Sequence, residues 1–224
     1  MRKEILGKSL KILFSVSLAV LILTFSIGLP IYVRPFYYLQ IDDLDIPERT
    51  GYTYEEIKSS FDELMDYLTL PGREFGIGVF PYSESGKAHF VDCRALFNLN
   101  LILLIISLSS VISLTVLDKK HIIELNEKKK MHLSYYVATT MLIIIAIVGV
   151  LASINFKTAF DIFHKIFFSG KSNWYFDYNY DPIILALPRK FFSNCAVLIL
   201  TSVIVLCIAI IIFNIIMKKK AKKA

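Results

Sequence analysis

The chain has 224 residues, 55% of them hydrophobic, and a mean hydropathy of +0.59. This apolar content exceeds the roughly 45–50% that is usual in soluble proteins, and it excludes an intrinsically disordered chain. The formal net charge is +6, so the position of the basic residues must decide between nucleic-acid binding and other roles. The three cysteines, Cys93, Cys195 and Cys207, have no metal-binding spacing and exclude a disulfide scaffold.

Four uncharged stretches are long enough to cross a membrane as helices. Each has at least 22 residues, which as a helix exceeds the roughly 30 Å hydrocarbon core of a bilayer. The first stretch is too long for the apolar part of a signal peptide and lacks a small-residue cleavage site, so we expect it to remain as an anchor. The four predicted transmembrane helices are 12–33, 95–117, 133–156 and 191–217.

The charged residues divide into a basic set and an acidic set. The N-terminal tail, the 118–132 loop and the 218–224 tail together hold 14 Lys and Arg but only four acidic residues. Segments 34–94 and 157–190 hold 11 basic and 15 acidic residues. The positive-inside rule therefore predicts that both termini and the 118–132 loop are cytoplasmic. The lysines of the 218–224 tail are expected to fix the membrane orientation and to contact anionic membrane lipids. We therefore expect no nucleic-acid binding.

The outer segment 34–94 is long enough to form a small folded cap. A capping box at Thr53–Glu56 precedes apolar residues at helical spacing, and a Pro-Gly pair ends the pattern. We expect an amphipathic helix over 54–69 that packs on other cap elements or on the bilayer surface. The 74–86 segment favours a strand or an extended loop, and the second membrane helix is expected to begin near Lys87.

The outer segment 157–190 combines a helical pattern with many aromatic residues. A helix is expected to end near Gly170, and Asp181 followed by Pro182 is predicted to cap and start a further short helix. Aromatic residues are common at membrane interfaces, but that tendency does not explain a histidine within the run.

Two histidines of the outer segments, His89 and His164, are the candidate catalytic residues. A single histidine at a membrane interface usually has a structural role. Two imidazoles at a similar depth can act as general base and general acid, because their unperturbed pKa near 6.5 lies close to the operating pH. Asp92 either orients the His89 ring or is a helix-surface acid paired with Arg94 or Lys87.

Other chemistries fit the sequence poorly. There is no GxSxG motif for a serine hydrolase, and a metal site would need a third ligand at a suitable spacing. We therefore expect no metal and no cofactor, with a membrane metalloenzyme that uses the same histidines as a rival interpretation. His121 and His132 lie on the basic side and are assigned no role.

Several sequence blocks together resemble the lipoprotein intramolecular transacylases of Firmicutes. The resemblance covers nearly the whole chain, and the two histidine blocks are its most specific parts. One departure is Phe90, where the family pattern has Met after the first histidine, and this replaces one apolar residue by another. The blocks are Tyr-x-x-Glu-Glu-Ile with Met-x-Tyr-Leu in Tyr52–Leu68, His-x-x-Asp at His89–Asp92, Phe-His-x-x-Phe-Phe-x-Gly with downstream Trp and Phe in Phe163–Phe176, and Asp-x-Ile-Ile with Pro-x-x-Phe-Phe in Asp181–Phe192.

The resemblance implies an all-α membrane enzyme with four transmembrane helices and a small, mainly helical extracellular cap. Its substrate would be a diacylglyceryl-modified lipoprotein, whose sn-2 acyl chain moves to the amine of the N-terminal cysteine and leaves the lyso-form. The two family histidines correspond to His89 and His164, in the plasma membrane of a Gram-positive bacterium and at its outer face. The aromatic residues expected to form a stiff substrate pocket are Phe160, Phe167, Phe168, Trp174 and Phe176.

The main rival interpretation is a non-enzymatic membrane subunit whose extracellular cap binds a partner. A transporter component would be expected to have charged or Gly/Pro-broken spans along a pathway. The four stretches carry no charge, which disfavours transport.

Overall fold

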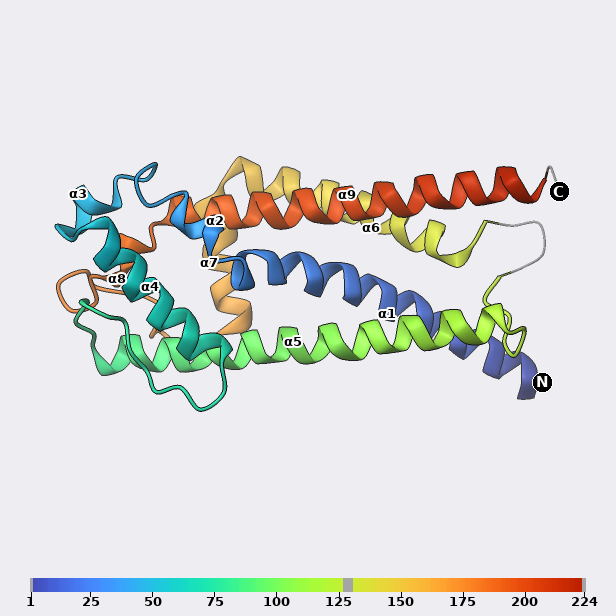
Figure 1. The fold of residues 1–224 in the computed structure, drawn as a ribbon, viewed down its shortest axis with the longest axis horizontal. Helices are drawn as coiled ribbons and strands as arrows, with labels where there is room; N and C mark the ends of the chain where they lie inside the picture. Colours follow the sequence, from blue (N-terminus) through green and yellow to red (C-terminus); the bar gives the residue numbers. More distant parts are fainter. Residues whose placement is uncertain (1, 127–130, 223–224) are drawn as a thin grey trace. The chain divides into compact units, whose positions relative to one another are not determined.

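The computed structural model describes residues 2–126 and 131–222, and all regular elements in them are α-helices (Figure 1). Four of these helices are long and apolar enough to cross a membrane. The prediction of an all-α membrane protein is therefore confirmed. Lys128, Lys129, Lys130 and Lys223, which contribute to the charge asymmetry, lie outside the described residues. The four long helices are α1 (Arg2–Tyr32), α5 (Glu84–Lys119), α6 (Leu133–Ile154) and α9 (Arg189–Ala221).

The chain divides into two compact units, each built from segments that are distant in the sequence. The first unit comprises Met1–Ile27, Leu101–Val150 and Ile199–Ala224, and the second comprises Gly28–Asn100 and Leu151–Leu198. All the shorter helices belong to the second unit (Figure 1). They are α2 (Pro35–Tyr38), α3 (Ile46–Thr50), α4 (Tyr54–Thr69), α7 (Phe156–Phe167) and α8 (Ile183–Ala186).

In the first unit, the long helices pack through apolar side chains and a few hydroxyl pairs. Ser17 of α1 donates to Ser110 of α5 at 2.9 Å, and Ser26 of α1 donates to Ser202 of α9 at 3.0 Å. Such pairs satisfy polar groups that would otherwise face hydrocarbon, and they specify which helix faces contact one another.

In the second unit, α4 forms as its sequence predicts. Thr53 and Glu56 make both hydrogen bonds of the capping box, and the helix covers Tyr54–Thr69, so the expected 54–69 helix is confirmed. Its apolar stripe is buried in the core of this unit, where the ring of Phe61 stacks on Tyr37 with centroids 3.8 Å apart. The Tyr37 hydroxyl donates to the Ala186 carbonyl at 2.9 Å and so joins α2 to α8.

The start of α5 is fixed by Asp181, a residue of segment 157–190. The Ser83 hydroxyl accepts a hydrogen bond from the Gly86 N–H at 2.9 Å, which caps the helix and places its first residue at Glu84, before the expected start at Lys87. The Asp181 carboxylate accepts hydrogen bonds from the Ser83 N–H and hydroxyl, both at 2.7 Å.

The prediction that the Asp181 side chain caps its own short helix is therefore wrong. The N-cap of α8 is Pro182, which makes no side-chain capping bond. The carboxylate of Asp181 instead accepts a hydrogen bond from Ser83, at the N-terminal end of α5. Its negative charge there also interacts favourably with the positive end of the helix dipole. The preceding 74–83 segment is a loop with turns and contains no strand.

Helix α7 begins at an N-cap that also ends α6. The extended backbone of Asn155 (φ −153°) interrupts the helical path, and its side chain accepts from the Thr158 N–H at 3.1 Å. At the other end, the last helical residue is Phe167, and Gly170, three residues later, adopts φ +77°. The helix therefore ends near Gly170, as the sequence predicts. This helix carries His164 on the face that is buried in the second unit.

Candidate active site

His89 and His164 lie face to face in the second unit. His89 comes from the second turn of α5 and His164 from the last turn of α7. Their ring centroids are 5.9 Å apart with an interplanar angle of 30°, and the residues are only 6% and 8% exposed. Two neutral imidazoles at this separation can pass protons to and from one small reacting group.

Aromatic rings hold His164 on several sides. Trp174 stacks against it with centroids 4.8 Å apart, and Phe160 lies one helical turn earlier at 4.2 Å. Phe168 lies 5.5 Å from His164 and 4.8 Å from His89, so this ring contacts both histidines. These rigid aromatic rings restrict the rotation of the His164 imidazole.

A hydrogen bond specifies the tautomer of His164. Its Nδ1 lies 2.8 Å from the Phe160 carbonyl oxygen, and because a carbonyl oxygen only accepts, Nδ1 must carry the proton. The Nε2 atom then holds a lone pair. Burial lowers the pKa of His164 below its usual value near 6.5, although the Phe160 carbonyl and the Asp161 carboxylate act in the opposite direction. This imidazole is therefore neutral at pH 7 and able to accept a proton.

The surroundings of His89 leave one nitrogen without a partner. Its Nε2 lies 3.4 Å from the Cys93 Sγ, one turn further along α5. Its Nδ1 is buried and has no hydrogen-bond partner among the described residues. The ring of Phe176 meets His89 edge-on at 5.4 Å, and Phe90 packs against Phe176 at 5.7 Å.

Asp92 joins α5 to the segment that follows α7. Its carboxylate forms an ion pair with Lys171 and accepts a hydrogen bond from the Asn173 Nδ2 at 3.0 Å. Within the described part of the chain it has no ion pair with Arg94 or Lys87, and no hydrogen bond to His89 is found. Asp92 thus anchors the loop that carries Trp174, whose Nε1–H donates to the Lys171 carbonyl at 3.1 Å.

Four of the five aromatic residues expected in the pocket contact a histidine, and the fifth does not. Phe167 is 53% exposed and its ring contacts Phe163 at 4.7 Å. Phe163, which sequence reasoning did not assign to the pocket, meets His164 edge-on at 5.4 Å. The four that contact a histidine are Phe160, Phe168, Trp174 and Phe176.

Sequence reasoning also missed Cys93, Lys171 and Asn173. The i,i+4 spacing of His89 and Cys93 on one helix could have indicated their contact. No local pattern could have indicated Lys171 and Asn173, because their partner Asp92 is 79 and 81 residues away.

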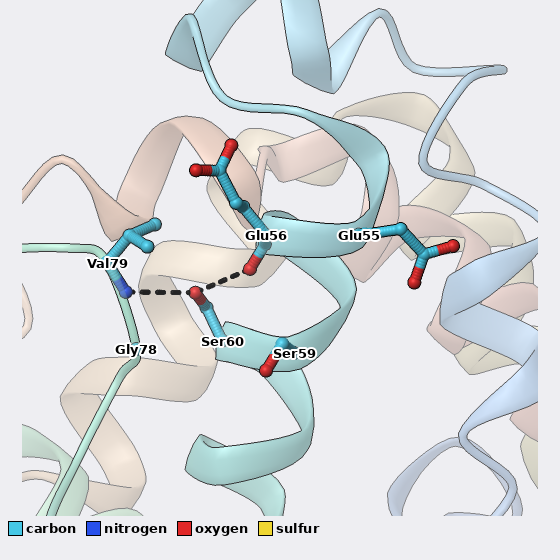
Figure 2. A pocket seen from close by; sticks show the side chains of 6 residues that line it. All are labelled: Glu55, Glu56, Ser59, Ser60, Gly78 and Val79. Carbon is cyan, nitrogen blue, oxygen red and sulfur yellow. Dashed lines mark hydrogen bonds between the residues drawn. The ribbon is translucent and has the colours of Figure 1, made fainter.

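Elsewhere in the second unit, a small pocket lies where α4 meets the loop before α5 (Figure 2). The Ser60 hydroxyl donates to the Glu56 carbonyl at 2.7 Å and accepts from the Val79 N–H at 3.2 Å. Gly78 is required here, because a Cβ at this position would lie 2.2 Å from the Ser60 Oγ. None of the residues that line this pocket contacts either histidine, so the pocket is separate from the candidate site. Among the described residues, no group of three His, Cys, Asp or Glu is arranged to hold a metal ion.

Comparisons with known proteins agree with the sequence resemblance. A family model described as lipoprotein intramolecular transacylase Lit matches residues 12–192. The structure of the membrane-integral lipoprotein intramolecular transacylase Lit from Bacillus cereus superposes with a TM-score of 0.84 at 28% identity, covering 98% of this chain and 99% of that chain.

Two further structures of the Bacillus cereus protein, in which one histidine is replaced, are also similar. The arginine variant has a TM-score of 0.78 at 25% identity, covering 96% of this chain and 95% of its own. The alanine variant has a TM-score of 0.79 at 26% identity, covering 98% and 96%. No curated protein sequence matches the chain significantly.

Proposed function

The chain belongs to the lipoprotein intramolecular transacylase family and is a multi-pass membrane acyltransferase, and we propose that His89 and His164 catalyse its acyl transfer by acid–base chemistry. The substrate is a lipoprotein whose N-terminal cysteine carries a diacylglyceryl group and a free amine. The sn-2 acyl chain moves to that amine, which gives an N-acylated lyso-form. The observation that carries the proposal is the face-to-face pair of buried imidazoles, 5.9 Å apart.

His164 is assigned the role of general base. Its Nδ1 proton is held by the Phe160 carbonyl, so the lone pair on Nε2 is the one that can take a proton from the attacking amine. Burial lowers its pKa and keeps the ring neutral, which a base requires.

His89 is assigned the role of hydrogen-bond donor to the oxyanion. The Cys93 thiol lies close enough to donate its S–H to His89 Nε2, and the proton of this ring is then on Nδ1. That N–H has no partner among the described residues and is free to donate to the substrate. It can donate a hydrogen bond to the oxyanion that develops on the ester carbonyl.

The step balances without a covalent enzyme intermediate. The amine nitrogen bonds to the ester carbonyl carbon and loses a proton to His164 Nε2. The carbon–oxygen bond to the glyceryl sn-2 oxygen breaks, and that oxygen takes the proton that His164 Nε2 now carries. His89 keeps its proton throughout, so both rings end in their starting states.

The aromatic residues are proposed to supply the substrate geometry. Both reacting groups belong to one molecule, so the main barrier is to fold the amine onto the ester. Holding such a pair in a near-attack arrangement can contribute up to about 7–11 kcal/mol. The rings of Phe160, Phe168, Trp174 and Phe176 form a wall around the two histidines that suits this task.

The proposed location is the plasma membrane of a Gram-positive bacterium, with the site at its outer face. The charge asymmetry supports cytoplasmic termini, and His89 lies six residues before the uncharged run that begins at Ala95. Anionic membrane lipids are the proposed partners of the lysines in the C-terminal tail.

A crossover experiment with purified protein tests this function. Two synthetic peptides, each with an N-terminal S-diacylglyceryl cysteine but different acyl chains and sequences, are incubated together with the full chain in lipid. Because an intramolecular transfer leaves the intact mass unchanged, the position of each acyl chain is read from fragmentation spectra and from the loss of amine reactivity. We expect N-acylation of each peptide by its own chain only. Crossed products, or amines that stay reactive, would contradict the proposal.

A further inference from the structure

Two buried side-chain atoms of the second unit have no hydrogen-bond partner among the described residues. They are His89 Nδ1 and Asn173 Oδ1. Most buried polar atoms in proteins are paired, so each unpaired one needs an explanation. The proposed mechanism uses His89 Nδ1 as a donor, and it leaves the Asn173 oxygen unexplained.

The orientation of the Asn173 amide is fixed by its neighbours. Its Nδ2 donates to the Asp92 carboxylate at 3.0 Å, and an ionised carboxylate only accepts. A flipped amide would place two acceptors against each other, so the oxygen must face away from Asp92. The ion pair between Asp92 and Lys171 holds this carboxylate in place.

Asn173 is linked to both histidines through its neighbours. Its partner Asp92 is three residues after His89 on α5, and residues at this spacing are adjacent on a helix surface, with Cβ atoms about 5–6 Å apart. The residue after Asn173 is Trp174, which stacks on His164. Asn173 is thus one neighbour away from each imidazole, and its buried acceptor is a candidate contact for a ligand held between them.

We infer that the Asn173 amide oxygen binds the attacking α-amine of the substrate's N-terminal cysteine. This inference rests on the proposed function. A diacylglyceryl group has only acceptors, so the amine is the N–H donor that lies next to the reacting ester. The two unpaired atoms then complement the two reacting groups, with His89 Nδ1 directed to the ester oxygen and Asn173 Oδ1 to the amine.

A neutral acceptor suits an amine nucleophile better than a carboxylate. An α-amine has an unperturbed pKa of about 7.7–8.0, and a nearby negative charge would favour its protonated form, which has no lone pair for attack. Because Lys171 and Asn173 bind the Asp92 carboxylate, the charge of Asp92 is compensated and the substrate meets an amide oxygen instead.

The test measures binding, so that it does not depend on turnover. The probes are two lipopeptides with ether-linked chains that cannot be transferred, one with the α-amine and one in which hydrogen replaces it. For the full-length wild-type protein in lipid, we expect the amine-bearing peptide to bind roughly tenfold more tightly. In Asn173→Ala this preference should fall clearly, to what the His164 Nε2 acceptor alone provides, while the peptide without the amine binds as before.

Two further variants keep the result interpretable. Asn179→Ala is the matched control, because the Asn179 amide donates to Asp177 in an exposed turn of the same segment. This variant should keep the preference. Asn173→Leu retains side-chain volume and replaces the alanine variant if that one does not fold.

An unchanged preference in Asn173→Ala and Asn173→Leu would overturn the inference and would indicate that only water pairs with this oxygen. Equal loss of the preference in Asn179→Ala would also overturn it, because a general disturbance of this segment would then explain the effect. Neither result affects the proposed function, which fails only if the transferable ester peptides give no N-acylated product.

Discussion

At the scale of single residues, two nitrogen atoms carry the proposed catalysis. His164 Nε2 has a free lone pair because Nδ1 is bonded to the Phe160 carbonyl. His89 Nδ1 has no partner among the described residues. The two histidines therefore differ in their hydrogen bonds, and the proposed assignment of His164 as the base rests on this difference.

Substitution of either histidine should remove activity. We expect His89→Ala and His164→Ala each to lower the rate by about 10²-fold or more, the usual range for losing general acid–base catalysis. The double variant should be little worse than the slower single variant, because both groups act on the same transfer. The measurement is the rate of N-acylation of a diacylglyceryl peptide.

The control for these variants is His121→Asn. His121 is exposed and has φ 56°, a left-handed conformation that Asn tolerates well, whereas His132 lies 3.9 Å from Asp118 and is less suitable. Normal rates in both histidine variants, with the protein correctly folded, would remove the acid–base mechanism.

The pH profile should have an acidic limb that belongs to His164. Burial lowers the pKa of this group below 6.5, so its base form persists down to a lower pH and is lost only as the pH falls through the lowered pKa. The substrate amine adds a second limb near its own pKa of about 7.7–8.0. The profile of kcat/KM between pH 4.5 and 9 on the ester peptide resolves the two.

Asp161→Asn provides a directional check on this assignment. The Asp161 carboxylate raises the pKa of His164, so its removal should move the acidic limb to still lower pH and leave the amine limb in place. A shift toward higher pH, or no second limb at all, would argue against His164 as the base.

At the scale of elements, the first turn of α5 positions His89. This turn is held by Ser83 and by the Asp181 carboxylate from the second outer segment. It also requires a glycine, because a Cβ at Gly86 would lie 2.3 Å from the Asp181 Oδ1 and 3.0 Å from the Phe176 ring. Since Phe176 contacts His89, the packing of this turn is linked directly to the site.

Gly86→Ala should therefore destabilise the protein and slow the reaction. We expect a loss of about 1–3 kcal/mol, typical of overpacking, although alanine is the better helix former. Gly7→Ala is the control, because a Cβ at Gly7 meets no atom within 4 Å and should leave the protein stable. Thermal unfolding in detergent measures the effect, and equal unfolding temperatures for the two variants would contradict it.

At the scale of the whole molecule, the charge distribution predicts where each outer segment lies. We expect Ser59→Cys to react with a membrane-impermeant maleimide added to intact cells, and Glu124→Cys to react only after the cells are opened. Both positions are exposed, whereas neighbouring Ser60 and Leu125 are buried and would label poorly. Labelling of Glu124→Cys from outside would place the histidines in the cytoplasm and exclude the proposed substrate.

The sequence alone determined the features that depend on local patterns. The four membrane-crossing helices follow from long uncharged runs, and α4 follows from a capping box and an apolar stripe of helical period. The two histidines could also be chosen as candidates from the sequence, because both lie in segments that the charge distribution predicts on the same side of the membrane. These signals lie within a few helical turns, where backbone geometry alone decides which residues are adjacent.

Only the tertiary structure decided how the site is assembled. Asp92 binds Lys171 and Asn173, and Asp181 binds Ser83, across 79 to 98 residues of chain. A carboxylate can pair with any donor that the fold brings near, so its partner cannot be derived from spacing. Phe163 and Phe167 both lie on the apolar side of α7. Only the packing of this helix decided that Phe163 contacts His164 while Phe167 is exposed.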